Sequence, residues 1–146
     1  MPGLDELCAE ARAEGYNFIE RLASEWESGG NRFDAPGEIL CGHVDRRLLV
    51  AVGGLNVDPF AGHAEVGRIR RVYVRAAWRG KGIGAALVTA LTDEARKNFA
   101  CVRLRAENPD AARLYERLGF VPVEDSSATH ILNFSSAKSA AKVDRR

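Results

Sequence analysis

Arg79-Gly80-Lys81-Gly82-Ile83-Gly84 is the segment around which this chain is organised. It lies between an extended run, residues 68–74, and a run with helical apolar spacing, residues 83–98. Glycine lets the backbone approach a ligand closely and adopts positive φ without steric cost. A helix start presents unpaired N–H groups and the positive end of the helix dipole. The segment therefore predicts a strand-to-helix turn that binds a phosphate or pyrophosphate, with Arg79 and Lys81 adding positive charge.

Other interpretations of the same glycines are less consistent with the sequence around them. A Walker loop is excluded because Lys81 is followed by Gly82 and not by Ser or Thr. A dinucleotide fingerprint fits loosely as Gly80, Gly82 and Ala85, with Glu107 downstream. The first strand of such a fold is nearly all apolar, whereas the strand here carries several arginines. Nicotinamide binding and a glycine turn without any ligand stay open as alternatives on this evidence.

Two further motifs follow the glycine segment in a characteristic order and spacing. Val72-Tyr73-Val74 precedes it, and the run from Asn108 to Phe120 contains Leu114-Tyr115-Glu116-Arg117-Leu118-Gly119-Phe120. Together the three motifs resemble the GNAT (Gcn5-related N-acetyltransferase) superfamily, strongly over roughly residues 64 to 123 and weakly elsewhere. The resemblance implies an α/β (α+β) fold with a mixed central sheet flanked by helices. In that fold two parallel strands splay apart and the pantetheine arm of acetyl-CoA lies between them.

Composition predicts one ordinary globular domain. The chain has 146 residues and a formal net charge of +1, so no strong basic field indicates a nucleic acid or an acidic membrane surface as partner. No apolar run reaches the length of a membrane span. Cys8, Cys41 and Cys101 are odd in number and far apart, which is simplest in a reduced, cytoplasmic chain. We expect a domain over residues 1–134 and a disordered tail over 135–146, with a homodimer as one assembly that is open to the chain.

Periodicity and breakers predict the order of the elements. Residues 4–28 are expected to be helical with a break at Gly15, and Gly53-Gly54 is expected to mark a bulge or a close backbone approach. Asn108 is expected to cap a helix that ends before Gly119. The remaining prediction is a hairpin over 38–44 and 48–57, a strand over 65–74, a helix over 83–98, a strand over 101–105, and closing strands over 120–123 and 129–134.

The resemblance also assigns the coenzyme contacts. It implies that backbone atoms of Val72, Tyr73 and Val74 bind the pantetheine arm and the acetyl carbonyl. The residues that it implies for the pyrophosphate are Arg79, Gly80, Lys81, Gly82, Ile83 and Gly84. Asn108 matches the family asparagine that contacts the coenzyme, although a helix cap is an equal alternative. Tyr115 matches the tyrosine near the sulfur, where it would protonate the leaving thiolate; the alternative is a packed aromatic.

The general base is not apparent from the sequence. A lysine-like amine has a pKa of about 10.4 and must lose a proton before it attacks a thioester, so a base is useful. Several GNAT enzymes use a glutamate at positions that correspond here to Arg68 and Arg103. Glu65, with Asp58 and His63 as further substitutes, is the candidate, and each is also a plausible solvated edge or loop residue. No metal is expected, because Glu65 and His63 alone do not make a metal site.

The expected function is therefore an acetyl-CoA-dependent N-acetyltransferase that acts directly on a primary amine of a small molecule or peptide. A non-catalytic acyl-CoA-binding module of the same fold is the alternative, since the usual base is missing. The resemblance places the acceptor among the N-terminal helices and the loops beside the sheet, here roughly residues 26–37 and 55–63.

Overall fold

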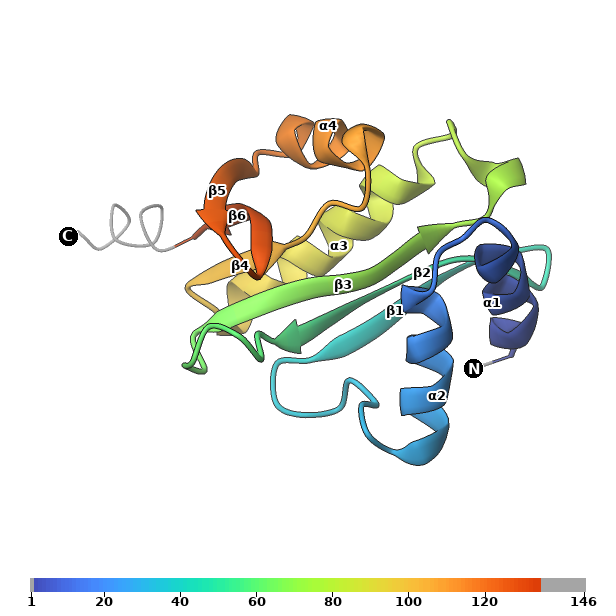
Figure 1. Ribbon diagram of the computed structural model, residues 1–146, viewed down its shortest axis with the longest axis horizontal. Coiled ribbons are helices and arrows are strands. Elements are labelled where there is room, and N and C mark those ends of the chain that lie inside the picture. The colour runs from blue at the N-terminus through green and yellow to red at the C-terminus, as the bar shows by residue number, and fades with distance from the viewer. Residues whose placement is uncertain (1, 135–146) are drawn as a thin grey trace.

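The computed structural model describes residues 2–134, so the expected tail lies outside the described residues. Its element order, shown in Figure 1, is the one that periodicity predicts. The helices are α1 (Leu4–Ala13), α2 (Phe18–Ser28), α3 (Ile83–Asn98) and α4 (Pro109–Arg117), with a 3₁₀ turn, η1 (Ala76–Trp78), which was not predicted. The strands are β1 (Ile39–Asp45), β2 (Leu48–Val57), β3 (Val66–Val74), β4 (Cys101–Leu104), β5 (Val121–Asp125) and β6 (Ala128–Asn133).

The strands form one mixed sheet in the order β1-β2-β3-β4-β6-β5, and β3 and β4 are its parallel pair. This pair is joined only from Val66↔Cys101 to Arg68↔Arg103, while β3 continues to Val74. Within residues 2–134, no strand pairs with that edge of β3 beyond Arg68. The predicted splayed pair is confirmed, and it leaves backbone groups on β3 available to a ligand.

Helices cover both faces of the sheet (Figure 1). On one face, α1 and α2 bury Leu7, Ile19 and Leu22 against Val52 and Tyr73 of the sheet. On the other face, the apolar stripe of α3 is buried in a second core cluster that includes Leu87, Val88, Leu91 and Ala95. The two clusters hold β2 and β3 rigidly between them, which fixes the backbone that borders the splayed gap.

A β-bulge interrupts the pairing of β2 with β3, where a bulge was predicted. Val52 pairs with Tyr73 and Gly54 with Arg70, so one β2 residue stands opposite two residues of β3. Arg71, in the extra position, has a φ of 61°, which is uncommon for a residue other than glycine. A bulge bends a strand and redirects its side chains. Next to the bulge, the Arg71 side chain reaches Glu25 of α2.

Local signals at the chain reversals are confirmed. Gly15, with a φ of 90°, separates α1 from α2, and Gly29 ends α2 with a φ of 82°. Asn108 caps α4 by accepting a hydrogen bond from the Ala111 N–H at 2.8 Å, and Pro109 takes the first helical position. No helix in the described part of the chain is long and apolar enough to span a membrane.

Candidate active site

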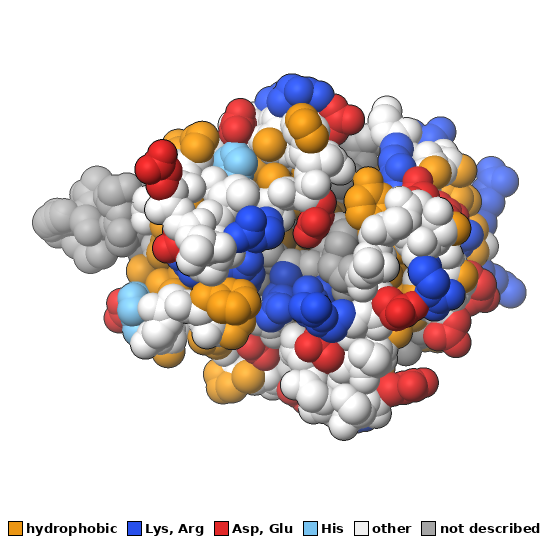
Figure 2. All heavy atoms as spheres, in the orientation of Figure 1, with side chains coloured by type: hydrophobic (Ala, Val, Ile, Leu, Met, Phe, Trp, Pro, Cys, Tyr) orange, Lys and Arg blue, Asp and Glu red, His pale blue; other side chains and the backbone are white. Residues whose placement is uncertain are grey.

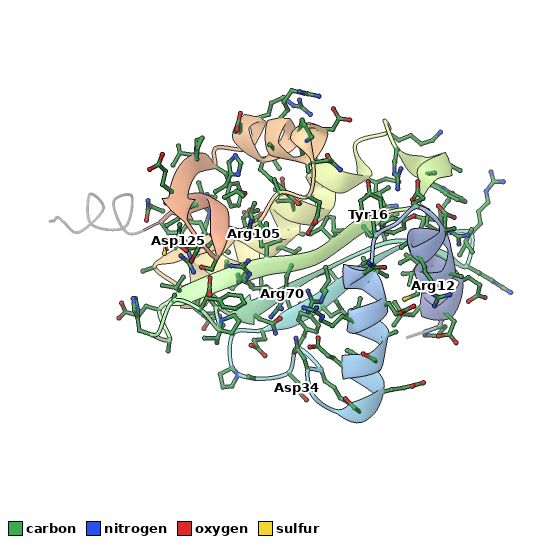
Figure 3. All side chains as sticks on the ribbon, viewed as in Figure 1. Arg12, Tyr16, Asp34, Arg70, Arg105 and Asp125 are labelled. Carbon is green, nitrogen blue, oxygen red and sulfur yellow. The ribbon has the colours of Figure 1, made fainter. Side chains whose placement is uncertain are left out.

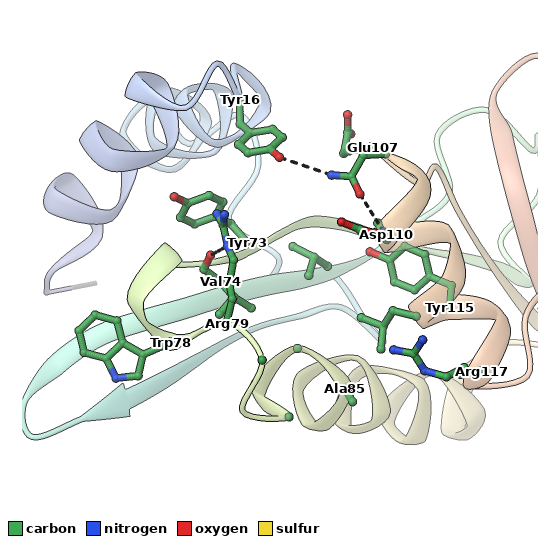
Figure 4. A pocket seen from close by; sticks show the side chains of 17 residues that line it. Tyr16, Tyr73, Val74, Trp78, Arg79, Ala85, Glu107, Asp110, Tyr115 and Arg117 are labelled. Carbon is green, nitrogen blue, oxygen red and sulfur yellow. Dashed lines mark hydrogen bonds between the residues drawn. The ribbon is translucent and has the colours of Figure 1, made fainter.

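A cavity of about 480 Å³ occupies the gap between the end of β3 and α4 (Figure 4). Its walls come from Val72, Tyr73 and Val74 of β3, from the glycine turn before α3, and from the first two turns of α4. This volume lies in the range of small-molecule sites, which is roughly 300–1,000 Å³. The cavity therefore forms where the parallel strands part, and the three sequence motifs meet at its walls.

The glycine turn gives this cavity a wall with open space and unpaired N–H donors. Gly80 and Gly82 have left-handed φ values of 78° and 83°, and a Cβ placed on either would meet no other atom within 4 Å. Gly82 caps α3, a helix of 16 residues without an acidic side chain in its first turn. The first N–H groups of a helix have no intrahelical acceptor and carry the positive end of the dipole. The open space and these donors fit a pyrophosphate.

Arg79 stands beside this turn but its charge is already paired. Its guanidinium binds both carboxylate oxygens of Glu14, at 2.7 and 3.0 Å, and its Nε donates to the Val74 carbonyl at 2.8 Å. Arg79, Gly80, Gly82 and Gly84 line the cavity, whereas the side chains of Lys81 and Ile83 belong to its surroundings. Lys81 is exposed, and Ile83 packs against the core cluster of α3.

Tyr73 is held from the side of α1. Its hydroxyl donates to Glu14 and lies 3.3 Å from the Glu10 carboxylate, which also accepts from the Ala76 N–H at 2.8 Å. Burial, together with the hydrogen bond to Glu14, raises the pKa of Tyr73. Its side chain thus anchors α1 to the end of β3, and its backbone is the part that remains for a ligand.

Asn108 both caps α4 and faces the cavity. Its Oδ1 accepts from Ala111 within the cap, while its Nδ2 donates to the Tyr16 hydroxyl at 3.4 Å across the cavity mouth (Figure 4). Tyr16 was not predicted to belong to the site. It lies on the short connection between α1 and α2, and neither periodicity nor a motif indicates that this connection reaches α4.

Tyr115 occupies the inner end of the cavity. It is 6% exposed and packs against Phe120 and His130, with ring centroids 5.8 and 6.5 Å away. Its hydroxyl makes no hydrogen bond to any residue among 2–134, and Figure 4 shows it pointing into the cavity. Burial, with a smaller contribution from the negative charge of Glu107, raises the pKa of Tyr115 to about 12. The hydroxyl is therefore protonated at neutral pH and can donate.

A second cavity, of about 220 Å³, meets the first at Tyr115. It opens on the face covered by α2, and its walls include Arg21, Arg70 and Phe60. Val72, Glu107 and Tyr115 line both cavities. Residues 26–37 and 55–63 were expected to surround an acceptor. Only the second of these regions, through Phe60, contributes to the wall of this cavity. A ligand in each cavity would come together beside Tyr115.

The structure does not bring Glu65 to this junction. Glu65 is exposed just before β3 and lines neither cavity, and its carbonyl accepts from the Ala100 N–H at 2.8 Å. Seven residues of extended chain separate it from Val72, a span of about 23 Å. His63, in the preceding loop, is likewise outside both cavities. Glu65 and His63 thus lie at the opposite end of β3 from Tyr115.

Asp58 is buried in an arginine cluster at that same end. Its Oδ2 accepts from Arg103 Nε at 2.9 Å and lies 3.4 Å from Arg68 Nη1, and its Oδ1 accepts from the Phe60 N–H at 2.7 Å. Burial by itself would raise the pKa of Asp58, but these donors and charges together lower it. Asp58 is therefore an ionised structural carboxylate. It clamps the paired ends of β3 and β4 and pairs with Arg68 and Arg103, the two positions at which the resemblance implies a base.

Among residues 2–134 no three His, Cys, Asp or Glu side chains are grouped closely enough to hold a metal ion. The junction itself holds the Tyr115 hydroxyl and the Glu107 carboxylate.

Comparison with known proteins places this geometry in context. Residues 44–122 match the family model of the acetyltransferase (GNAT) domain. A candidate acetyltransferase from Exiguobacterium sp. 255-15 is 30% identical, with a TM-score of 0.80 over 93% of this chain and 87% of that one. No curated protein matches the sequence.

Two more distant structures share the fold alone. The GNAT family N-acetyltransferase YhbS from Escherichia coli, solved in complex with CoA, is 15% identical, with a TM-score of 0.67 over 91% of this chain and 77% of that one. The ribosomal-protein-alanine N-acetyltransferase from Brucella melitensis is 21% identical, with a TM-score of 0.64 over 89% of this chain and 90% of that one.

Proposed function

Since the chain belongs to the GNAT acetyltransferase family, we propose that it is an acetyl-CoA-dependent N-acetyltransferase that acts on a primary amine of a small molecule or peptide. The observation that carries this proposal is the meeting of two cavities at Tyr115. One has a wall suited to a pyrophosphate, and the other opens on the opposite side toward α2. Two substrates can thus be present together, which direct transfer requires.

The first cavity offers groups that can bind the pyrophosphate and the pantetheine arm of acetyl-CoA. When bound, the coenzyme supplies an activated acetyl thioester. The N–H groups at the start of α3, with Gly80, Gly82 and Gly84, would hold the pyrophosphate. Backbone groups of residues 72–74, on the unpaired edge of β3, would bind the pantetheine arm. Lys81 would add charge from outside, and Asn108 would contact the coenzyme from the cap of α4.

Two side chains at the junction are suited to the proton transfers. Tyr115, protonated because its pKa is about 12, would donate a proton to the departing sulfur. Glu107 is the one acidic residue of the described chain that lines both cavities, so it would accept a proton from the amine. We place the base there and not at Glu65, whose position before β3 is too remote for proton transfer at Tyr115.

A non-catalytic acyl-CoA-binding module remains the second candidate, because Arg68 and Arg103 replace the usual glutamates and are bound to Asp58. Calorimetric titration with acetyl-CoA and with NAD, followed by a CoA-release assay on an amine panel, separates the possibilities. Binding of acetyl-CoA with CoA release supports the transferase. Binding without release from any amine supports the module, and binding of NAD alone contradicts both.

The assignment of Glu107 has its own test. Glu107→Gln keeps the size of the side chain and removes the base, so we expect the rate to fall by about 10²–10⁴-fold with acetyl-CoA affinity retained. Glu124→Gln, on the exposed strand β5, is the matched control and should leave the rate unchanged. An equal rate in the Glu107 variant would show that solvent removes the amine proton.

A further inference from the structure

Arginines make up half of the residues that line the second cavity. Five of its ten lining residues are arginines, and Glu107 is its single acidic residue; the arginines are Arg21, Arg68, Arg70, Arg71 and Arg105. Figure 2 shows Lys and Arg side chains gathered around the centre of this face. A concentration of like charge in a concave wall is unfavourable unless anions balance it. In a chain whose net charge is only +1, this local excess indicates a function for the cavity.

Carboxylates of the protein balance only part of this charge. Arg68 shares Asp58 with Arg103, and Arg71 lies 3.3 Å from Glu25 of α2. The Arg70 side chain makes no hydrogen bond and no ion pair within the described part of the chain. The Nε atoms of both Arg70 and Arg71 are buried without a hydrogen-bond partner there. The Nη groups of Arg70 are not among these buried atoms and have no partner in residues 2–134, so they are accessible donors in a residue that lines the cavity and can bind a ligand there.

The bulge in β3 is what brings these donors together. Side chains of neighbouring strand residues normally point to opposite faces. With Arg71 in the bulged position, Arg71 pairs with Glu25 of α2, and Arg70 and Arg71 both line the cavity. Figure 3 shows Arg70 beside α2, with Arg105 on the other side of β3 in the view. The uncommon backbone conformation at Arg71 thus places two consecutive guanidinium groups on one wall.

The electrostatics of Arg70 agree with this geometry. Burial, followed by the nearby charges of Arg71 and Arg68, lowers the pKa of Arg70 to about 10. A bound oxyanion would raise the pKa of Arg70 again, because its negative charge favours the protonated guanidinium. Guanidinium groups also bind carboxylate and phosphate oxygens with paired hydrogen bonds. The cavity, at about 220 Å³, has the size for a small group and not for a polymer.

We propose that this arginine-lined cavity binds the oxyanion group, a carboxylate or a phosphate, of a small acceptor that also carries the reactive amine. The inference rests on the proposed function and narrows its substrate to anionic amines. Arg70 and Arg71 are the specificity-determining residues, and the amine end of the acceptor extends toward Glu107 and Tyr115, where the cavities meet.

Matched pairs of amines test this substrate class. Phosphoethanolamine against ethanolamine tests the phosphate, and β-alanine against propylamine tests the carboxylate, in a chloride buffer free of phosphate and sulfate. We expect the anionic member of one pair or both to have the higher kcat/KM. In Arg70→Gln this preference should fall on the order of ten- to a hundredfold, the size of one charge-assisted hydrogen bond, chiefly through KM. Lys97→Gln, an exposed charge change at the end of α3, should leave it unchanged.

Direct binding separates failure of this inference from failure of the proposed transfer. Phosphoethanolamine and β-alanine are titrated into the protein saturated with CoA, and into its Arg70→Gln variant. If no amine releases CoA but an anionic amine binds in an Arg70-dependent way, the oxyanion site stands and the transferase proposal fails. Equal use of neutral and anionic amines, or binding and preference unaffected by Arg70→Gln in a folded variant, overturns the inference.

Discussion

Arg79 binds both carboxylate oxygens of Glu14, at 2.7 and 3.0 Å, and so joins the end of α1 to the start of the glycine turn. The pKa of Glu14 is lowered by this hydrogen bond and by that of the Tyr73 hydroxyl. An arginine that was expected to present its charge to a phosphate is thus paired within the protein. We therefore expect anion binding at the turn to depend mainly on the backbone N–H groups of α3 and less on side-chain charge.

This pairing predicts unequal effects of the two cations. Lys81→Ala should weaken acetyl-CoA binding only a few-fold, and less at high salt, because an exposed charge contributes about 0.2–1 kcal/mol and is screened. Arg79→Ala should weaken it more, with little salt dependence, because the turn loses its attachment to α1. Calorimetric titration at two salt concentrations measures both effects, with Lys97→Ala as the control. Complete loss of binding in Lys81→Ala would instead assign the anion to that side chain.

A second prediction concerns the space beside Gly82. In Gly82→Ala the added methyl group would enter the open region in front of α3, so we expect a loss of acetyl-CoA affinity beyond any loss of stability. Gly62→Ala is the matched control, since Gly62 has the same left-handed backbone, with a φ of 87°, and open surroundings but lies outside both cavities. Thermal unfolding should report similar destabilisation in both variants. Equal acetyl-CoA affinity in both would remove the pyrophosphate assignment.

The elements of this fold were predictable because their signals are local. The bounds of β2 and α3, the Asn108 cap and the bulge at Gly53-Gly54 all follow from periodicity, capping and glycine placement over a few residues. The first cavity was predictable for the same reason. Residues 72–74 and 79–84 are short continuous segments, and the third motif supplies Asn108 and Tyr115 from one helix and its cap.

The second cavity was not predictable in this way. It combines Arg21 of α2, Phe60 of a loop and Arg105 beyond β4, which only the packing of α2 on the sheet brings together. Similarly, Asp58 reads as a loop residue in the sequence, and its hydrogen bond to Arg103 spans 45 positions. Ion pairs between residues so far apart in the sequence leave no periodic pattern. Which charged side chains are paired and which are not is therefore known only from the three-dimensional structure.

The Asp58 cluster leads to a stability prediction. Asp58→Asn leaves Arg68 without a carboxylate in a buried site and Arg103 with Asp125 alone, and breaking a buried pair in this way costs about 3–5 kcal/mol. The pKa of Asp58 is lowered in the folded state, so its contribution is present above its unfolded pKa and is lost as the pH falls through the folded value. Urea unfolding should therefore show a constant difference from the wild type at pH 5–8, shrinking below about pH 4. The exposed Asp34→Asn should show no such difference.

Tyr115→Phe tests the one hydroxyl to which we assign a proton transfer. The variant keeps the ring that packs against Phe120 and His130 and deletes only the donor, so folding should survive. A positioned general acid contributes about 10²–10⁴-fold in rate, so we expect kcat to fall by that factor with little change in the KM for acetyl-CoA. Such a pattern means that the hydroxyl acts in the transition state and not in binding.

The pH dependence sharpens this test, because the pKa of Tyr115 is about 12 and the hydroxyl stays protonated through the range in which the protein can be assayed. The wild type should accordingly show no decline of kcat from tyrosine ionisation below about pH 10. Retention of the full kcat in Tyr115→Phe, once the chemical step is shown to limit turnover, would reduce the residue to a packed aromatic. The thiolate would then have to take its proton from solvent or from the attacking amine.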